Sequence, residues 1–278
     1  MCLKITVGCA IIEPMTILDS IILGAIQGLT EFLPVSSSGH LIIARQYLGI
    51  QSMNGLAYDA VLQLATILAV GLYFWRDIWG LIKSFFKLVF RKTLAGKEAT
   101  LFWAIFIGTI PAVIFGLLFE KSMDTIFRNI HLVALTLVLG SILMFFAEKY
   151  AKQNKTLTVG KGFLAGLFQT LALLPGVSRS GATISGGLFL GFTREEATRF
   201  SFLLAFPVIL GSGLKKLLDL YQGHELVVLG PSLWISSIFA FVVGLGAIHF
   251  LITYLKKHTL YAFVIYRLLL VVVLLALF

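Results

Sequence analysis

Six stretches of this chain are long and apolar enough to cross a membrane as helices. A spanning helix needs about 20 mostly apolar residues. The stretches lie near 58–75, 101–119, 131–148, 200–218, 233–254 and 260–278. The whole chain is 59% hydrophobic and 13% charged, whereas a soluble domain is about 45–50% apolar and about 25% charged. These figures exclude a soluble, disordered or disulfide-scaffolded protein and predict an all-α polytopic membrane protein.

Two further apolar regions, 17–50 and 162–191, are each interrupted in the middle. The first is broken at 33–39 by the sequence LPVSSSG, and the second at 175–181 by PGVSRSG. Each half is only about 10–14 residues long, which suits a re-entrant hairpin better than a span. Unwound backbone survives at membrane depth only where protein or water satisfies its polar groups. We therefore expect both breaks to be buried or to line a cavity.

The two broken regions align with each other without gaps at an offset of 142 residues, with seven identities in sixteen positions. This alignment predicts two repeats, 17–148 and 162–278, each a re-entrant helix hairpin plus three transmembrane helices. An odd number of spans per repeat gives the two repeats inverted topology. A leader at 1–16 precedes them and a cytoplasmic linker at 149–161 joins them.

Basic residues orient the bundle. The segments 76–100 and 149–161 are rich in Lys and Arg, and such loops stay on the cytoplasmic side. Alternation then places both termini, and the entrance of the first hairpin, on the outer side. The net charge of +9 is explained by topology, so no nucleic-acid partner is expected.

The polar residues of the two breaks are the candidate site, because polar groups inside an apolar bundle are costly and mark function. Serine-rich turns before a helix offer backbone N–H groups to phosphate, and Arg179 adds a permanently charged donor. Glu31 is the candidate ligand for a divalent cation, Mg²⁺ or Ca²⁺. The candidate substrate-binding residues are Gln27, Ser36, Ser38, Ser178, Ser180 and Thr183.

Other interpretations remain open for these residues. A single membrane serine is as often a packing residue as a ligand, and Glu31 and Arg179 could form a purely structural ion pair. Inverted repeats with broken helices are also typical of transporters, so the alternative function is a transporter or lipid flippase.

The motifs QGLTEFLPVSSSGH at 27–40 and PGVSRSGAT at 175–183 resemble the two signatures of the bacterial undecaprenyl-diphosphate phosphatases, the bacitracin-resistance proteins. The resemblance extends from about residue 17 to the C-terminus. It implies a membrane hydrolase that converts undecaprenyl diphosphate to undecaprenyl phosphate and inorganic phosphate, which recycles the lipid carrier for cell-wall synthesis. The expected location is the bacterial plasma membrane, with the active site on the outer side.

The resemblance also implies roles for individual residues. Glu31, Ser37, His40 and Arg179 match catalytic positions, and a divalent metal is required. Gln27 stands at a position that is Glu or Gln in the family, which leaves Glu31 as the main acid. Ser37 is the preferred nucleophile, while His40 and a metal-activated water stay open. Undecaprenyl diphosphate, membrane lipid, bacitracin as a competitor for the same substrate, and a possible homodimer are the expected partners.

Overall fold

The computed structural model describes residues 6–7, 10–11, 15–50, 55–126, 129–223 and 225–277. Much of the expected leader at 1–16 lies outside these residues. The helices are α1 Ile17–Phe32, α2 Ser37–Tyr47, α3 Gly55–Tyr73, α4 Trp75–Val89, α5 Gly96–Ile126, α6 Ile130–Lys149, α7 Val159–Thr170, the 3-10 helix η1 Leu171–Leu173, α8 Arg179–Phe189, α9 Arg194–Gln222, α10 Glu225–Leu255 and α11 Tyr261–Leu277. Two short strands, β1 Thr6–Val7 and β2 Ala10–Ile11, pair in antiparallel orientation.

Several of these helices are built to cross a membrane. Within the described residues, four helical segments are long and apolar enough: Gly96–Phe119, Ile130–Lys149, Arg194–Gln222 and Gly230–Leu255. The helices α3 and α4 qualify together but are bent by 90° at their junction. The apolar helix α11, at 17 residues, is slightly shorter than these spans. Large apolar side chains are exposed along all of them, as a lipid environment requires. The chain is an all-α, multi-pass membrane protein.

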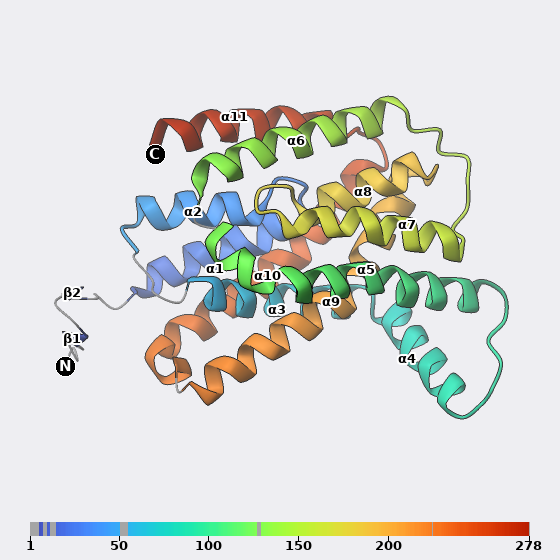
Figure 1. The fold of residues 1–278 in the computed structure, drawn as a ribbon, viewed down its shortest axis with the longest axis horizontal. Coiled ribbons are helices and arrows are strands. Elements are labelled where there is room, and N and C mark those ends of the chain that lie inside the picture. Colours follow the sequence, from blue (N-terminus) through green and yellow to red (C-terminus); the bar gives the residue numbers. More distant parts are fainter. Residues whose placement is uncertain are drawn as a thin grey trace.

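The segment 76–100, which the sequence analysis treats as a loop, contains a helix of its own. Helix α4 occupies most of it and leaves the bundle at a steep angle to α3 (Figure 1). Its apolar residues cover a wide arc and its basic residues a narrow one, a pattern typical of a helix that lies in the membrane interface. The basic charges obscured this apolar periodicity in the sequence.

The two breaks have the same backbone geometry. Ser36 and Ser178 adopt φ angles of 75° and 71°, a left-handed conformation that costs energy for any residue with a side chain. Each serine caps the helix that follows it, since Ser36 Oγ accepts from Gly39 N at 3.4 Å and Ser178 Oγ accepts from Gly181 N at 3.2 Å. These positions correspond at the offset of 142 residues, which is consistent with the predicted repeat.

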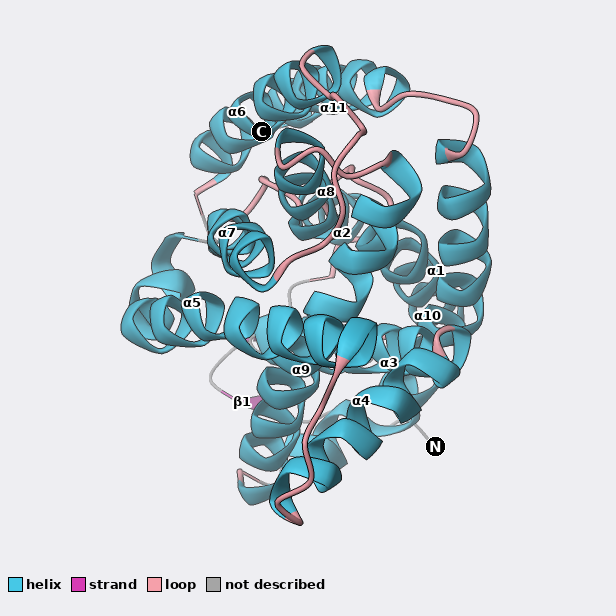
Figure 2. Cartoon of the chain, turned by 90° about the vertical axis from the view of Figure 1, so that its right-hand side faces the viewer, coloured by secondary structure: helices cyan, strands magenta, loops and turns pink. Residues whose placement is uncertain are grey.

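The first helix of each hairpin packs on the other half of the chain. Helix α1 lies beside α10, and α7 lies beside α5 (Figure 1 and Figure 2). Glycines make both contacts close: a Cβ added at Gly24 would lie 2.2 Å from Ser236 O, and one at Gly166 would lie 2.0 Å from Gly108 O. Because α1 packs on the second half of the chain and α7 on the first, the two breaks meet in the middle of the bundle.

A substitution at the α7–α5 contact tests its importance for stability. We expect Gly166→Ala to destabilise the protein by about 1–3 kcal/mol, because the added methyl group meets backbone that cannot yield. Gly160→Ala in the same helix is the matched control, since nothing lies within 4 Å of a Cβ there, and it should be neutral or slightly stabilising. Thermal unfolding in detergent measures both variants, and equal midpoints would contradict the proposed close contact.

Candidate active site

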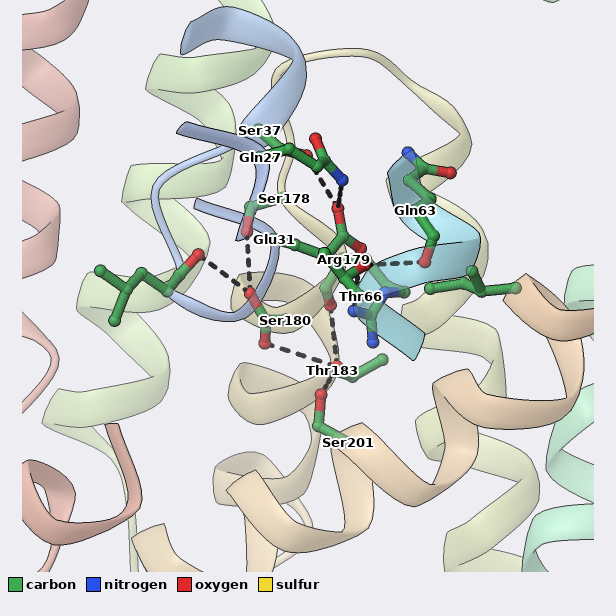
Figure 3. A network of polar contacts seen from close by, with 12 residues as sticks. Gln27, Glu31, Ser37, Gln63, Thr66, Ser178, Arg179, Ser180, Thr183 and Ser201 are labelled. Atoms are coloured by element: carbon green, nitrogen blue, oxygen red, sulfur yellow. Dashed lines mark hydrogen bonds and ion pairs between the residues drawn. The ribbon is translucent and has the colours of Figure 1, made fainter. Parts of the chain in front are cut away.

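Glu31 stands at the centre of the polar cluster between the two breaks (Figure 3). Its Oε1 atom accepts from Arg179 Nη2 at 3.0 Å, and its Oε2 atom accepts from Gln27 Nε2 and from Ser37 Oγ, each at 3.0 Å. The side chains of Glu31 and Arg179 are only 5% and 12% exposed. One carboxylate thus joins the first hairpin to the second, and three of the sequence-predicted residues converge on it.

Arg179 is only partly used by this ion pair. Its Nε and Nη1 atoms are buried and have no hydrogen-bond partner among the described residues, although Nη2 binds Glu31. Buried donors left unpaired carry a large free-energy cost, so they identify a position prepared for an anion. The structural ion pair considered in the sequence analysis is present, but it does not account for the other two guanidinium nitrogens, Nε and Nη1.

The serines bind the breaks to each other. Ser38 Oγ accepts from Gly176 N at 3.2 Å, and Ser180 Oγ donates to Leu33 O at 3.2 Å. Within each break, Ser36 pairs with Ser38 at 3.1 Å and Ser178 pairs with Ser180 at 3.2 Å. The contacts are reciprocal, because each break supplies one serine to the backbone of the other.

Thr183 supports Arg179 from one turn further along α8. Its hydroxyl donates to Arg179 O at 2.8 Å and is in contact with Ser201 Oγ of α9. Thr183 is 2% exposed and Ser201 is fully buried. The threonine therefore anchors the first turn of α8 against α9, at the end of the helix that carries the guanidinium.

His40 lies in α2, and its ring nitrogens contact neither Glu31 nor Ser37. Its Nδ1 atom is 2.8 Å from Ser36 O, which can only accept, so Nδ1 carries the proton. In the neutral imidazole Nε2 then accepts from the Tyr266 hydroxyl at 2.7 Å. The two rings stack with centroids 5.6 Å apart. This arrangement fixes the tautomer and makes Tyr266 the neighbour through which His40 would exchange a proton.

Helix α11 contributes an arginine to the site that was not among the residues predicted from the sequence. Arg267 is fully buried and donates to Gly176 O at 3.0 Å and to Pro34 O at 3.4 Å, one carbonyl from each break. It also bonds Leu137 O and Ser141 Oγ, both at 3.0 Å. The available signal was a single arginine in an otherwise apolar stretch, because an intramembrane charge marks a site by default.

The donor set around Glu31 limits the metal ion that could bind. Among the described residues, no three His, Cys, Asp or Glu side chains lie together. Glu31 offers one carboxylate, and the buried Gln27 Oε1 has no hydrogen-bond partner in the described part of the chain. Mg²⁺ is commonly held by one or two carboxylates plus substrate phosphates and water, whereas Ca²⁺ takes 6–8 oxygen ligands. These residues fit a magnesium ion shared with a phosphorylated substrate.

Comparison with known proteins identifies the relatives of this chain. The family model of bacitracin resistance protein BacA matches residues 20–273. The chain belongs to this family. It is 46% identical over 268 residues to the undecaprenyl-diphosphatase of Mycolicibacterium smegmatis, covering 95% of this chain and 97% of that protein. It is also 43% identical over 278 residues to the undecaprenyl-diphosphatase of Chloroherpeton thalassium, covering 94% and 96%. The BacA match includes every residue of the two breaks and Arg267.

Proposed function

We propose that this protein is an undecaprenyl-diphosphate phosphatase, which hydrolyses undecaprenyl diphosphate to undecaprenyl phosphate and inorganic phosphate. The membership of the BacA family and the names of relatives covering nearly the full chain support this function. The observation that carries the chemistry is Arg179, whose buried Nε and Nη1 atoms have no hydrogen-bond partner among the described residues and can donate to phosphoryl oxygens.

The contacts of Ser37 support a two-step transfer. In this mechanism Ser37 Oγ attacks the terminal phosphorus while Glu31 Oε2, 3.0 Å away, takes its proton. The bond from phosphorus to the bridging oxygen breaks, and undecaprenyl phosphate leaves with the electron pair. Water then releases phosphate from the serine. Arg179 holds the charge that develops on the phosphoryl oxygens. Direct attack by a water that Glu31 activates is the alternative.

Glu31 and Gln27 Oε1 would hold the divalent cation that we propose as cofactor. When bound, Mg²⁺ would neutralise charge on the diphosphate. We expect a chelator to lower phosphate release from undecaprenyl diphosphate at least about tenfold, since a metal ion contributes several kcal/mol to such a transition state. Added Mg²⁺ should restore the rate better than Ca²⁺. A rate unchanged by chelation would contradict the proposed cofactor.

The basic segments support a location in the plasma membrane, with segments 76–100 and 149–161 in the cytoplasm and both termini outside. The first hairpin would then receive its substrate from the outer side, where cell-wall synthesis releases the diphosphate and where bacitracin competes for it. A homodimer is compatible with this arrangement.

A flippase is not favoured by the comparisons, because the relatives are named as diphosphatases. Translocation also needs no serine bonded to a buried carboxylate beside an anion site. The decisive test of the enzyme is a phosphate-release assay on the purified chain with undecaprenyl diphosphate, where failure to release phosphate above the detergent blank would refute it.

A further inference from the structure

An apolar groove of about 590 Å³ lies between α4, α5 and α9, away from the polar cluster. Its walls include Phe85 and Phe86 of α4, Phe106, Ile110 and Ile114 of α5, and Phe206 of α9. The polar residue among the described lining residues, Thr109, donates its hydroxyl to Ile105 O at 2.8 Å. The wall therefore offers no free hydrogen-bonding group, and only hydrocarbon fits it without cost.

The length of the groove corresponds to one leaflet of a bilayer. Its lining follows α5 from Phe102 to Ile114, which is roughly 18 Å at the rise of an α-helix. The hydrocarbon core of a bilayer is about 30 Å thick. The groove therefore runs from the level of α4 to about the middle of the membrane, the depth that one lipid chain occupies.

Helix α4 marks the end of the groove that meets the membrane surface. Trp75 and Trp79 are 56% and 52% exposed, and tryptophans of this kind sit at the headgroup level. Arg76 lies over the first ring and Lys83 over the second, at 5.5 Å and 5.7 Å from the ring centroids. The segment 76–100 carries six basic and two acidic residues, so the headgroup region here is positive.

Polar bonds attach α4 to the bundle. Asp77 pairs with Arg199 of α9 at 2.5 Å, and Lys87 pairs with Glu98 of α5 at 2.8 Å. Ser84 also donates to Glu98 at 3.0 Å. These contacts hold the polar face of α4 against the starts of α5 and α9, while much of its apolar face borders the open groove. Helix α4 thus forms one wall of the apolar groove.

We propose that this groove binds a hydrocarbon chain of an anionic phospholipid from the same leaflet, with the lipid phosphate beside Lys83. The apolar walls favour a hydrocarbon chain, and the length of the groove matches a lipid of one leaflet. The basic residues of α4 favour a negatively charged headgroup. The site is separate from the proposed phosphatase chemistry and does not depend on it.

Native mass spectrometry of the detergent-solubilised protein tests the site, with phosphatidylglycerol and phosphatidylcholine as probes. We expect one phosphatidylglycerol to bind, and Ile110→Trp to lower its affinity at least about tenfold by filling the groove. Ile142→Trp on α6 is the control, since Ile142 is exposed to a similar degree, 46% against 41%, but lies outside the groove. Lys83→Glu should weaken phosphatidylglycerol about tenfold and leave phosphatidylcholine unchanged.

Each contrary result overturns the proposal. Equal lipid retention by Ile110→Trp and Ile142→Trp would remove the groove as the site, and Val113→Phe provides a smaller filling variant if Ile110→Trp does not fold. Equal binding of the two phospholipids would exclude the headgroup selection. One-for-one displacement of phosphatidylglycerol by undecaprenyl phosphate would assign the groove to the substrate's tail. A dimer that Ile110→Trp dissociates would assign it to a second copy of the chain.

Discussion

Replacing Arg179 with alanine should reduce the kcat for phosphate release about 10³-fold or more, the range measured when an arginine that stabilises a phosphoryl transition state is removed. The variant loses the positive charge and the two donors, Nε and Nη1, that have no hydrogen-bond partner among the described residues. It also leaves Glu31 buried without its positive partner. Initial rates with undecaprenyl diphosphate at saturating substrate measure the effect.

Two further arginine variants separate catalysis from folding. Arg179→Lys keeps the charge but loses the planar fork, so we expect folded protein with a rate reduced about 10²-fold. Arg199→Ala removes an arginine that is 54% exposed and pairs with Asp77 at the surface, and it should leave the rate nearly unchanged. If Arg179→Ala kept near-normal turnover, the assignment of the anion site would be wrong.

Replacing Ser37 with alanine should reduce phosphate release about 10³-fold or more if Ser37 is the nucleophile, because no side chain is then left to accept the phosphoryl group. Glu31 keeps its bonds to Arg179 and Gln27 in this variant, so the fold should be retained. The measurement is single-turnover phosphate release, combined with acid quenching to trap a phosphorylated serine.

Thr158→Ala is the control for Ser37→Ala. Thr158 caps α7 through Lys161 N and lies outside both breaks, so its loss should cost stability of about 1 kcal/mol and little of the rate of transfer. A Ser37→Ala variant that retains most of its activity would reject the serine route and favour water activated by Glu31.

The helices and breaks were easier to predict from the sequence than the contacts between them. The breaks at 33–39 and 175–181 were found because Pro, Gly and Ser interrupt apolar runs, and this signal is local. Four of the expected membrane spans, near 101–119, 131–148, 200–218 and 233–254, agree with the structure, because a long uninterrupted apolar run is also a local signal. The 90° turn into α4 was missed. Phe74, at the turn, contacts Phe202 of α9, and a contact between residues so far apart in the chain leaves no local signal.

For the candidate site, the sequence predicted most of the residues but not the hydrogen bonds and ion pairs between them. Glu31 and Arg179 were identifiable because charges are rare at membrane depth. Glu31 and Arg179 are 148 positions apart. They come together because α1 packs on the second half of the chain and α7 on the first, and no local sequence pattern predicts this packing. The pairing of His40 with Tyr266 could not be anticipated either, since a tyrosine in an apolar stretch gives no distinctive signal.

The bonds of Arg267 bear on the order in which the protein is made. This residue lies in the last helix and bonds a carbonyl of each break, so both breaks are synthesised long before the side chain that joins them. A nascent chain that has inserted every helix except α11 still lacks this link. The bonds from Arg267 therefore form only at the end of translation, and truncation anywhere before α11 removes them while leaving the serine and Glu31–Arg179 contacts between the breaks in the chain.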